Sequence, residues 1–404
     1  MIHSIRKCFL AVLVLIVFLE AAPAQERIVL KHFDKLDKIT IGEKSFHRLT
    51  GSVHYYIPEK NLNIYCDTTD YYPDEELYIL RGSVKLIDDE KSLMSDMIRY
   101  NTITEEAHSP GPFTYFEFES NRMLQADKGT YFYADNILFA ERNVEYSDSL
   151  RSIYADQMEY FEEEKHIDAS GNIKYIDYEQ NAVATARNGE FMEKEQYGIL
   201  TGEPRLAIAD SAGSDSLFIT GNQMEYFGAD SIRFTVSGSV TIQKGKIEAY
   251  CQQAAFDVDA SMVYLRLNPK IQHESTTMYG REIDLIIRDE TLTEVVVRDS
   301  AIALMDADTT GLYDLQNELR GKVINIYLDE ENINKVVATQ NAESMYYVFN
   351  NNDLQGKNIT SCGQIVVIFE NGNVSKTIAS PDAIGEFIPK SQLPEIKKKR
   401  FYEQ

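Results

Sequence analysis

The block Ala155-Asp156-Gln157-Met158-Glu159-Tyr160 decides the fold, because the chain repeats it as Gly221-Asn222-Gln223-Met224-Glu225-Tyr226. After each block comes a polar stretch, and then a glycine corner with a β-branched residue. These corners are Gly171-Asn172-Ile173 and Gly238-Ser239-Val240. Self-similarity of this kind is typical of repeat proteins, in which each unit buries its apolar face against its neighbours.

The glycine corner recurs along the chain. Its successive starts lie at positions 51, 82, 111, 142, 171 and 202, so the spacing alternates between 31 and 29 residues. Alternating hairpins give such a spacing. Beyond about residue 320 the pattern continues with longer insertions and a weaker resemblance. We therefore expect units of about 30 residues, each built around one corner.

Apolar residues alternate with Lys, Asp, Glu or Gln inside each unit, whereas the spacing of an amphipathic helix is nearly absent. This alternation is typical of half-buried β-strands. We predict an all-β fold, an elongated antiparallel stack of two facing sheets with a continuous apolar interior. The inward positions are Val53, Tyr55, Val84, Leu86, Ile98, Tyr100, Tyr131, Met158, Tyr160, Ile173, Tyr175, Met224, Tyr226, Val240, Ile242, Ile283 and Leu285.

The first 24 residues have the pattern of a secretory signal peptide. Arg6 and Lys7 precede an apolar run from Cys8 to Leu19, and Ala22-Pro23-Ala24 supplies a cleavage site. The apolar run is shorter than the ~20 residues that a membrane-spanning helix needs. We expect cleavage near Ala24 and a periplasmic location.

Charge argues against nucleic acid as a partner. The chain has 40 basic and 64 acidic side chains, a formal charge of −24, without a basic stripe. Phosphate neutralisation needs clustered Lys and Arg. The basic cluster at residues 397–400 follows Pro394 in a short polar tail, and we interpret it as solvated.

The chain shows no catalytic constellation. None of its histidines has the spacing of a metal-binding motif, and no nucleophile elbow or phosphate-binding glycine loop occurs. Its many carboxylates fall at outward strand positions and in turns. We therefore predict no enzyme activity, no catalytic residue, no cofactor and no metal site. The histidines considered outside the signal peptide are His32, His47, His54, His108, His166 and His273.

At Ala155, Asp156 and Tyr160, and at the corner Gly171-Asn172-Ile173, the sequence resembles the OstA-like family. This family contains the periplasmic bridge proteins of lipopolysaccharide transport typified by LptA, and the amino-terminal domain of LptD. Weaker copies of the block at residues 93–100, 126–131 and 221–226 extend the resemblance over about residues 45–300.

The resemblance implies an open β-jellyroll, V-shaped in section, whose apolar groove takes up the acyl chains of lipopolysaccharide. The inward positions given above would then line the groove. It also implies stacking through edge strands, either between copies of the chain or with other jellyroll domains of the envelope. The chain is about twice as long as a minimal bridge protein, which favours a longer bridge of the OstA-like type.

The signal-peptide pattern, the repeats and the prolines near the end together predict the organisation of the chain. It comprises a signal peptide at 1–24, a lead-in at 25–44, jellyroll repeats at 45–320, a continuation or cap at 321–380, and a Pro-containing basic tail at 381–404.

Two strands are candidates for the exposed edges, since residues 52–56 and 364–369 are rich in β-formers and poor in charge. Alternatively, the Pro-containing segment 380–394 folds back over the second edge.

Three functions compete at this point. A lipid-carrying bridge requires an open trough. A structural or adhesive repeat protein requires a closed, packed interior. A parallel β-helix that processes glycans is disfavoured, because the in-step glycine corners do not suit its coils and no acidic cluster recurs on one strand face.

Overall fold

A computed structural model describes residues 27–209, 216–228, 232–257, 259–288, 291–307, 314–329, 332–350, 353–370 and 373–394. They form 30 β-strands and three short 3-10 helices, so the predicted all-β fold is confirmed. The signal peptide at 1–24 and the basic cluster at 397–400 lie outside the described residues. Within the described ranges, no helix has the length and apolar character needed to cross a membrane.

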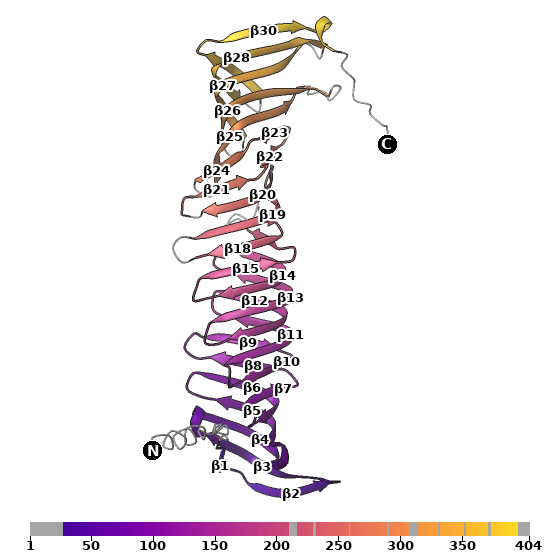
Figure 1. Cartoon of the computed structure of the whole chain (residues 1–404), viewed down its shortest axis with the longest axis vertical. Helices are drawn as coiled ribbons and strands as arrows, with labels where there is room; N and C mark the ends of the chain where they lie inside the picture. The colour runs from indigo at the N-terminus through magenta and orange to yellow at the C-terminus, as the bar shows by residue number, and fades with distance from the viewer. Residues whose placement is uncertain are drawn as a thin grey trace, which may run out of the picture. The chain divides into compact units, whose positions relative to one another are not determined.

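The chain divides into two compact units, and Figure 1 labels many of their strands. Unit 1 comprises residues 1–119 and 130–135, of which residue 27 is the first described. Its strands are β1 (Val29–His32), β2 (Lys35–Ile41), β3 (Lys44–Ile57), β4 (Leu62–Tyr72), β5 (Leu77–Ile87), β6 (Lys91–Asn101), β7 (Glu106–Ser109), β8 (Phe113–Glu117) and most of β10 (Lys128–Phe132), with the 3-10 helices η1 (Pro58–Lys60) and η2 (Pro73–Glu75).

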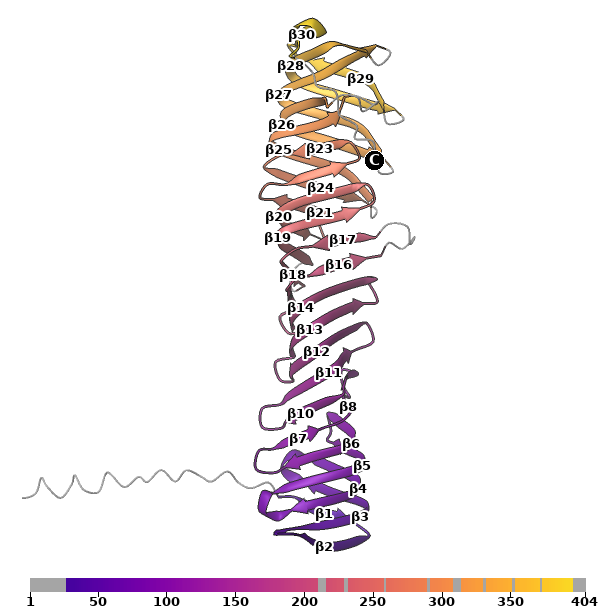
Figure 2. The same cartoon turned by 90° about the vertical axis from the view of Figure 1, so that its right-hand side faces the viewer.

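Unit 2 comprises residues 120–129 and 136–404. Figure 2 shows its strands β11 to β14 lying side by side. The strands of unit 2 are β9 (Arg122–Ala126), β11 (Ile137–Ser147), β12 (Arg151–Phe161), β13 (His166–Asp177), β14 (Ala182–Met192), β15 (Tyr197–Thr201), β16 (Arg205–Ile208), β17 (Leu217–Thr220), β18 (Gln223–Phe227), β19 (Arg233–Lys244), β20 (Ile247–Asp257), β21 (Met262–Arg266), β22 (Lys270–His273), β23 (Thr276–Tyr279), β24 (Glu282–Arg288), β25 (Thr291–Asp306), β26 (Gln316–Asp329), β27 (Asn332–Asn350), β28 (Asp353–Glu370), β29 (Asn373–Ser380) and β30 (Ile384–Pro389), with η3 (Lys390–Gln392).

The predicted corners are the points where strands pass from one sheet to the other. Strand β13 pairs with β14 through residues 166–170 and again through 173–177, and the register breaks between these two halves. Gly171 and Asn172 at the break have φ values of +73° and +48°, a region that glycine adopts at little steric cost. We call the sheet that contains residues 173–177 sheet A, and the sheet that contains residues 166–170 sheet B. Corresponding halves of the neighbouring strands continue both sheets.

The two sheets face each other in each unit. In unit 2, the rings of Tyr146 in sheet A and Tyr160 in sheet B are 5.5 Å apart, and those of Tyr175 and Phe191 are 5.9 Å apart. In unit 1, the rings of Tyr55 and Tyr78 meet across the interior with their centroids 5.4 Å apart. The prediction of two facing antiparallel sheets built from short repeats is therefore confirmed.

The prediction that residues 52–56 and 364–369 are edge strands is wrong. Residues 54–56 of β3 pair with β1 as well as with β4, and residues 364–368 of β28 pair with both β27 and β29. Each segment is covered because a further short sequence, in β1 or β29, still contains enough β-formers to add one strand. Of the alternative segment 380–394, β30 does fold back onto β28, but onto residues 356–361.

The strands β1, β2, β29 and β30 therefore form the edges in the described part of the chain, each with a strand partner on one side.

An Arg–Asp–Arg arrangement on the outer face of unit 1 joins three adjacent strands. The Asp70 side chain in β4 is only 2% exposed and accepts hydrogen bonds from Arg48 in β3 at 2.6 Å and from Arg81 in β5 at 2.6 Å. Unit 2 repeats the arrangement with Asp284 between Arg266 and Arg298. Charge-assisted hydrogen bonds of this type are stronger than neutral ones and fix the register of the strands.

Replacing Asp70 by asparagine is expected to lower the free energy of unfolding at pH 7 by about 1–3 kcal/mol. Burial raises the pKa of Asp70, but the hydrogen bonds from Arg48 and Arg81 outweigh it and hold that pKa below its ordinary value of 3.8. A carboxyl with a lowered pKa in the folded state stabilises the protein above its unfolded pKa, and this contribution is lost as the pH falls through the folded value.

The difference in the free energy of unfolding between the wild type and Asp70→Asn should therefore shrink as the pH falls below about 4. Urea unfolding at pH 7 and at pH 3 measures it. An equal difference at both pH values would contradict the assignment.

Candidate functional site

The interior between the two sheets contains almost all the predicted inward residues. Tyr175 is half-buried, and Tyr226 is 41% exposed. The others are buried, with at most 7% of their surface exposed: Val53, Tyr55, Val84, Leu86, Ile98, Tyr100, Tyr131, Met158, Tyr160, Ile173, Met224, Val240, Ile242, Ile283 and Leu285. Within each unit, strand alternation therefore places one continuous set of apolar side chains between the sheets.

The corners close one side of this interior. The hairpin turns lie on the opposite side, which we call the mouth. In unit 1, Lys60 from the β3–β4 turn forms an ion pair with Glu105 from the β6–β7 turn, which lies on the other sheet. The Lys91 ammonium lies 5.4 Å from the centroid of the Tyr131 ring. Charged side chains therefore lie across the mouth of unit 1 at these two places.

A similar contact crosses the mouth of unit 2 near its beginning. Arg122 in β9, on sheet A, forms an ion pair with Glu193 from the β14–β15 turn, on sheet B. Burial lowers the pKa of Arg122, but Tyr146 and Glu193 raise it more, so the guanidinium stays charged. This ion pair connects the two sheets at the mouth.

Small side chains line the interior in the middle of unit 2. The inward positions of β14 on sheet A are Ala182, Ala184 and Ala186, all buried. On sheet B, Gly189 faces inward and lies so close to sheet A that an added Cβ would be 3.2 Å from Ile173 Cδ1. Gly198 in β15 is opposite Phe191 in β14, and a Cβ added there would have no heavy atom nearer than 3.7 Å. The sheets therefore approach closely near the corner, whereas a Cβ at Gly198 would be accommodated with ordinary van der Waals contacts.

Beside these small residues, apolar side chains are partly open to solvent. The ring of Phe191 stacks on Tyr175, and Gly198 pairs with both Phe191 and Tyr226. Tyr226 is paired with Phe234, whose ring is 5.6 Å from that of Phe256. Burial raises the pKa of the Tyr175 phenol, so its ring stays neutral in water.

We call these five residues, Tyr175, Phe191, Tyr226, Phe234 and Phe256, the aromatic mouth. Tyr175 and Tyr226 were among the predicted inward positions, whereas Phe191, Phe234 and Phe256 were not. The sequence did carry a signal for the small-residue lining, in the alternation Ala182-Val183-Ala184-Thr185-Ala186.

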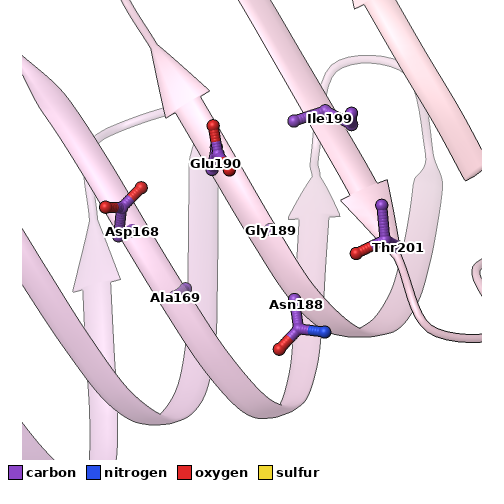
Figure 3. Close-up of a pocket in the computed structure, with 7 residues that line it drawn as sticks. All are labelled: Asp168, Ala169, Asn188, Gly189, Glu190, Ile199 and Thr201. Atoms are coloured by element: carbon purple, nitrogen blue, oxygen red, sulfur yellow. The ribbon is translucent and has the colours of Figure 1, made fainter.

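A shallow pocket of about 150 Å³ lies on the outer face of sheet B (Figure 3). Asp168, Ala169, Asn188, Gly189, Glu190, Ile199 and Thr201 line it. Figure 3 shows Asp168 and Glu190 on neighbouring strands, with both carboxylates on the same face of the sheet. This pocket contains two carboxylates and lies outside the apolar interior.

No family model and no curated protein matches the sequence. Among solved structures, the chain is similar to LptH of Pseudomonas aeruginosa, the LptA-homologous periplasmic component of the lipopolysaccharide transport device. The TM-score is 0.27 and the identity 16%, over 35% of this chain and 93% of that one. A second similarity, with a TM-score of 0.10 and 7% identity, covers 85% of this chain and 98% of the extracellular domain of a one component system from B. thetaiotaomicron. Because both similarities are low, a function has to be inferred from the interior of the protein itself.

Proposed function

We propose that the protein is a periplasmic lipid carrier that takes the acyl chains of lipopolysaccharide, or of a similar acylated lipid, into its apolar interior. It forms part of a bridge between the inner and outer membranes and is not an enzyme. The observation that carries this proposal is the aromatic mouth, where apolar side chains of the interior reach solvent next to a lining of small residues.

The energetics suit an acyl chain as the ligand. Removing one methylene group from water gains about 0.8 kcal/mol, so a chain of twelve carbons gains on the order of 10 kcal/mol before the cost of ordering it. The rings of Phe191, Phe234 and Phe256 and the alanine side chains present no polar group that an alkyl chain would leave unpaired, and the Tyr175 hydroxyl already donates a hydrogen bond to Asp177. The partly exposed rings of Tyr226 and Phe191 give the chain an entry.

Bridge formation requires edge strands that can accept a partner. The strands β1, β2, β29 and β30 fill this role, and the partner is a second copy or another envelope protein with a similar jellyroll. Apolar side chains are exposed on these strands, with Ile41 at 69% and Ile384 at 74%. Main-chain hydrogen bonds to an added strand would supply the affinity.

A structural or adhesive role is the second candidate, and a specific observation favours it. In unit 1 the interior is packed, since Leu80, Ile98 and Tyr100 are completely buried, and charged side chains lie across the mouth. An interior that stays closed throughout would give a stable scaffold without a ligand.

A photoreactive amino acid at Tyr226 is expected to capture lipid in the native envelope, whereas one at Glu225 is not. The two positions are neighbours on β18, but strand alternation places Tyr226 inward and Glu225 on the outer face. Mass spectrometry of the crosslinked protein identifies the adduct. Met158, Tyr160 and Met224 test how deeply the lipid enters, with Glu159 as a second outer-face control.

Equal capture at Tyr226 and Glu225 would show that contact with lipid is not specific to the interior. The absence of lipid at every inward position would favour the structural protein.

A further inference from the structure

We propose that His166, Asp168 and Glu190 form a binding site for a divalent transition metal ion, of the Zn²⁺ class, on the outer face of sheet B. The site lies outside the apolar interior and does not depend on the proposed lipid carriage.

Strand pairing brings the three side chains together. His166 and Asp168 are two residues apart on β13 and therefore lie on the same face. Asp168 is paired with Glu190 on β14. One potential ligand atom from each of the three residues lies within 4.8 Å of the other two, which is a spacing that a single cation can bridge.

Two of these ligand atoms are buried and have no hydrogen-bond partner. They are His166 Nε2 and Asp168 Oδ1, which lie 2.9 Å apart and form an ion pair when the imidazole is protonated, but without the alignment of a hydrogen bond. The His166 ring is held in place by stacking on Phe161, with the ring centroids 5.3 Å apart. Buried polar atoms without a hydrogen-bond partner are costly, and a metal ion bound by the neutral imidazole and the carboxylate would satisfy both.

The surrounding charges also favour a cation. Glu159 on β12 is paired with Asp168, so three carboxylates lie side by side on consecutive strands. Like charges directly opposite each other destabilise a sheet. The other outward side chains of these strand halves are Gln157, Phe161, Ser170, Asn188 and Met192, and none of them is basic.

The ligand set indicates the class of metal. An imidazole nitrogen with two carboxylate oxygens suits Zn²⁺ and similar transition ions better than Ca²⁺ or Mg²⁺, which prefer oxygen ligands alone. The pocket beside Asp168 and Glu190 leaves space for a further ligand from solvent (Figure 3). Because the ligands come from β13 and β14, bound metal would fasten these two strands and stabilise the folded state.

Titration calorimetry of the full chain with zinc chloride tests the site, and cobalt(II) absorption in the visible range reports its geometry. His166→Ala is expected to weaken zinc binding by at least about tenfold, because a lost ligand costs no less than a lost outer-shell partner. Glu190→Gln should also weaken it and remove the cobalt absorption. Zinc should raise the thermal unfolding midpoint of the wild type but not of His166→Ala, and EDTA should reverse the rise.

His32→Ala is the matched control. His32 and Asp34 have the same spacing in sequence, with His32 Nε2 3.5 Å from Asp34 Oδ1, but no third ligand completes that pair in the described part of the chain. This variant should bind zinc as the wild type does. Circular dichroism in EDTA checks that each variant is folded. Equal zinc affinity in the wild type and folded His166→Ala, or the same loss in His32→Ala, would overturn the proposal.

Discussion

Replacing Gly171 by alanine is expected to lower the free energy of unfolding by about 2–4 kcal/mol. Gly171 has a φ of +73°, and a Cβ at this position would lie 2.8 Å from the Cβ of Asp156 on the adjacent strand. That overlap cannot be relieved by rotating the Asp156 side chain, because its Cβ is fixed by the backbone. The corner itself must shift, and with it both halves of β13. Urea unfolding followed by circular dichroism measures the effect.

A matched corner without glycine provides the control. Leu267, between β21 and β22, occupies the position that glycine holds in the other corners. Its carbonyl accepts a hydrogen bond from the backbone N–H of Gln252, as the carbonyl of Gly202 does from the backbone N–H of Arg187. Leu267 has a φ of +61° and is 60% exposed. Leu267→Gly should therefore stabilise the protein by about 0.5–1 kcal/mol. A loss of less than about 0.5 kcal/mol in Gly171→Ala would show that the corner yields easily, contrary to this account.

Replacing Gly198 by tryptophan is expected to reduce lipid capture at Tyr226 by at least about tenfold, while the protein stays folded. The Cβ of the new side chain would have ordinary van der Waals contacts, with Glu190 O and Phe191 Cδ1 both at 3.7 Å. From there an indole ring would lie between Phe191 and Tyr226 and fill the aromatic mouth. Replacing a strand glycine also removes its entropic cost, so stability should not fall.

Ile199→Trp is the control, because Ile199 is the next residue on β15 and points to the outer face. It adds the same ring but should leave lipid capture unchanged. The readout is the yield of lipid adduct from the photoreactive residue at Tyr226, with the midpoint of thermal unfolding measured in parallel. Undiminished capture in a folded Gly198→Trp protein would mean that the acyl chain does not enter through this mouth.

The sequence was sufficient to predict the fold because the local alternation of apolar residues and the repeated glycine corners indicate the same arrangement of strands. Period-two alternation at residues such as Met158 and Tyr160 specifies which face of a strand is buried, and the glycine corner at Gly171 specifies where the strand changes sheet. Corners without glycine, such as Leu267 and Asn268, are harder to predict from sequence. Their backbone conformation is imposed by strand pairing on both sides and not by their own preference.

The candidate site was predicted less completely, because it depends on the sizes of side chains that neighbouring and facing strands bring together. The alternation that identified Tyr226 as inward says nothing about the space beside it, which results from Gly198 on a different strand. The two wrong edge assignments have a related cause. A segment such as 52–56 has the composition of an edge strand, but only pairing with β1 decides whether it is one.

The proposed metal ligands illustrate the same limit. His166 and Asp168 are close in sequence, but Glu190 lies on another strand, so no sequence motif contains all three. Only the register between β13 and β14 places Asp168 opposite Glu190.

Successive strands that contain a corner cross between the two sheets in alternating directions. This alternation also restricts how the chain can change in length. Strand β3 runs from one sheet of unit 1 to the other, β4 returns to the first sheet, and β5 crosses again. Deleting one such strand would reverse the direction of everything after it and point its inward side chains at solvent. Deleting or duplicating two consecutive strands preserves the direction of the following strands, the face to which each side chain points and the position of every corner. The hairpin of about 30 residues is therefore the smallest exchangeable module, and homologous chains are expected to differ in length by whole multiples of it.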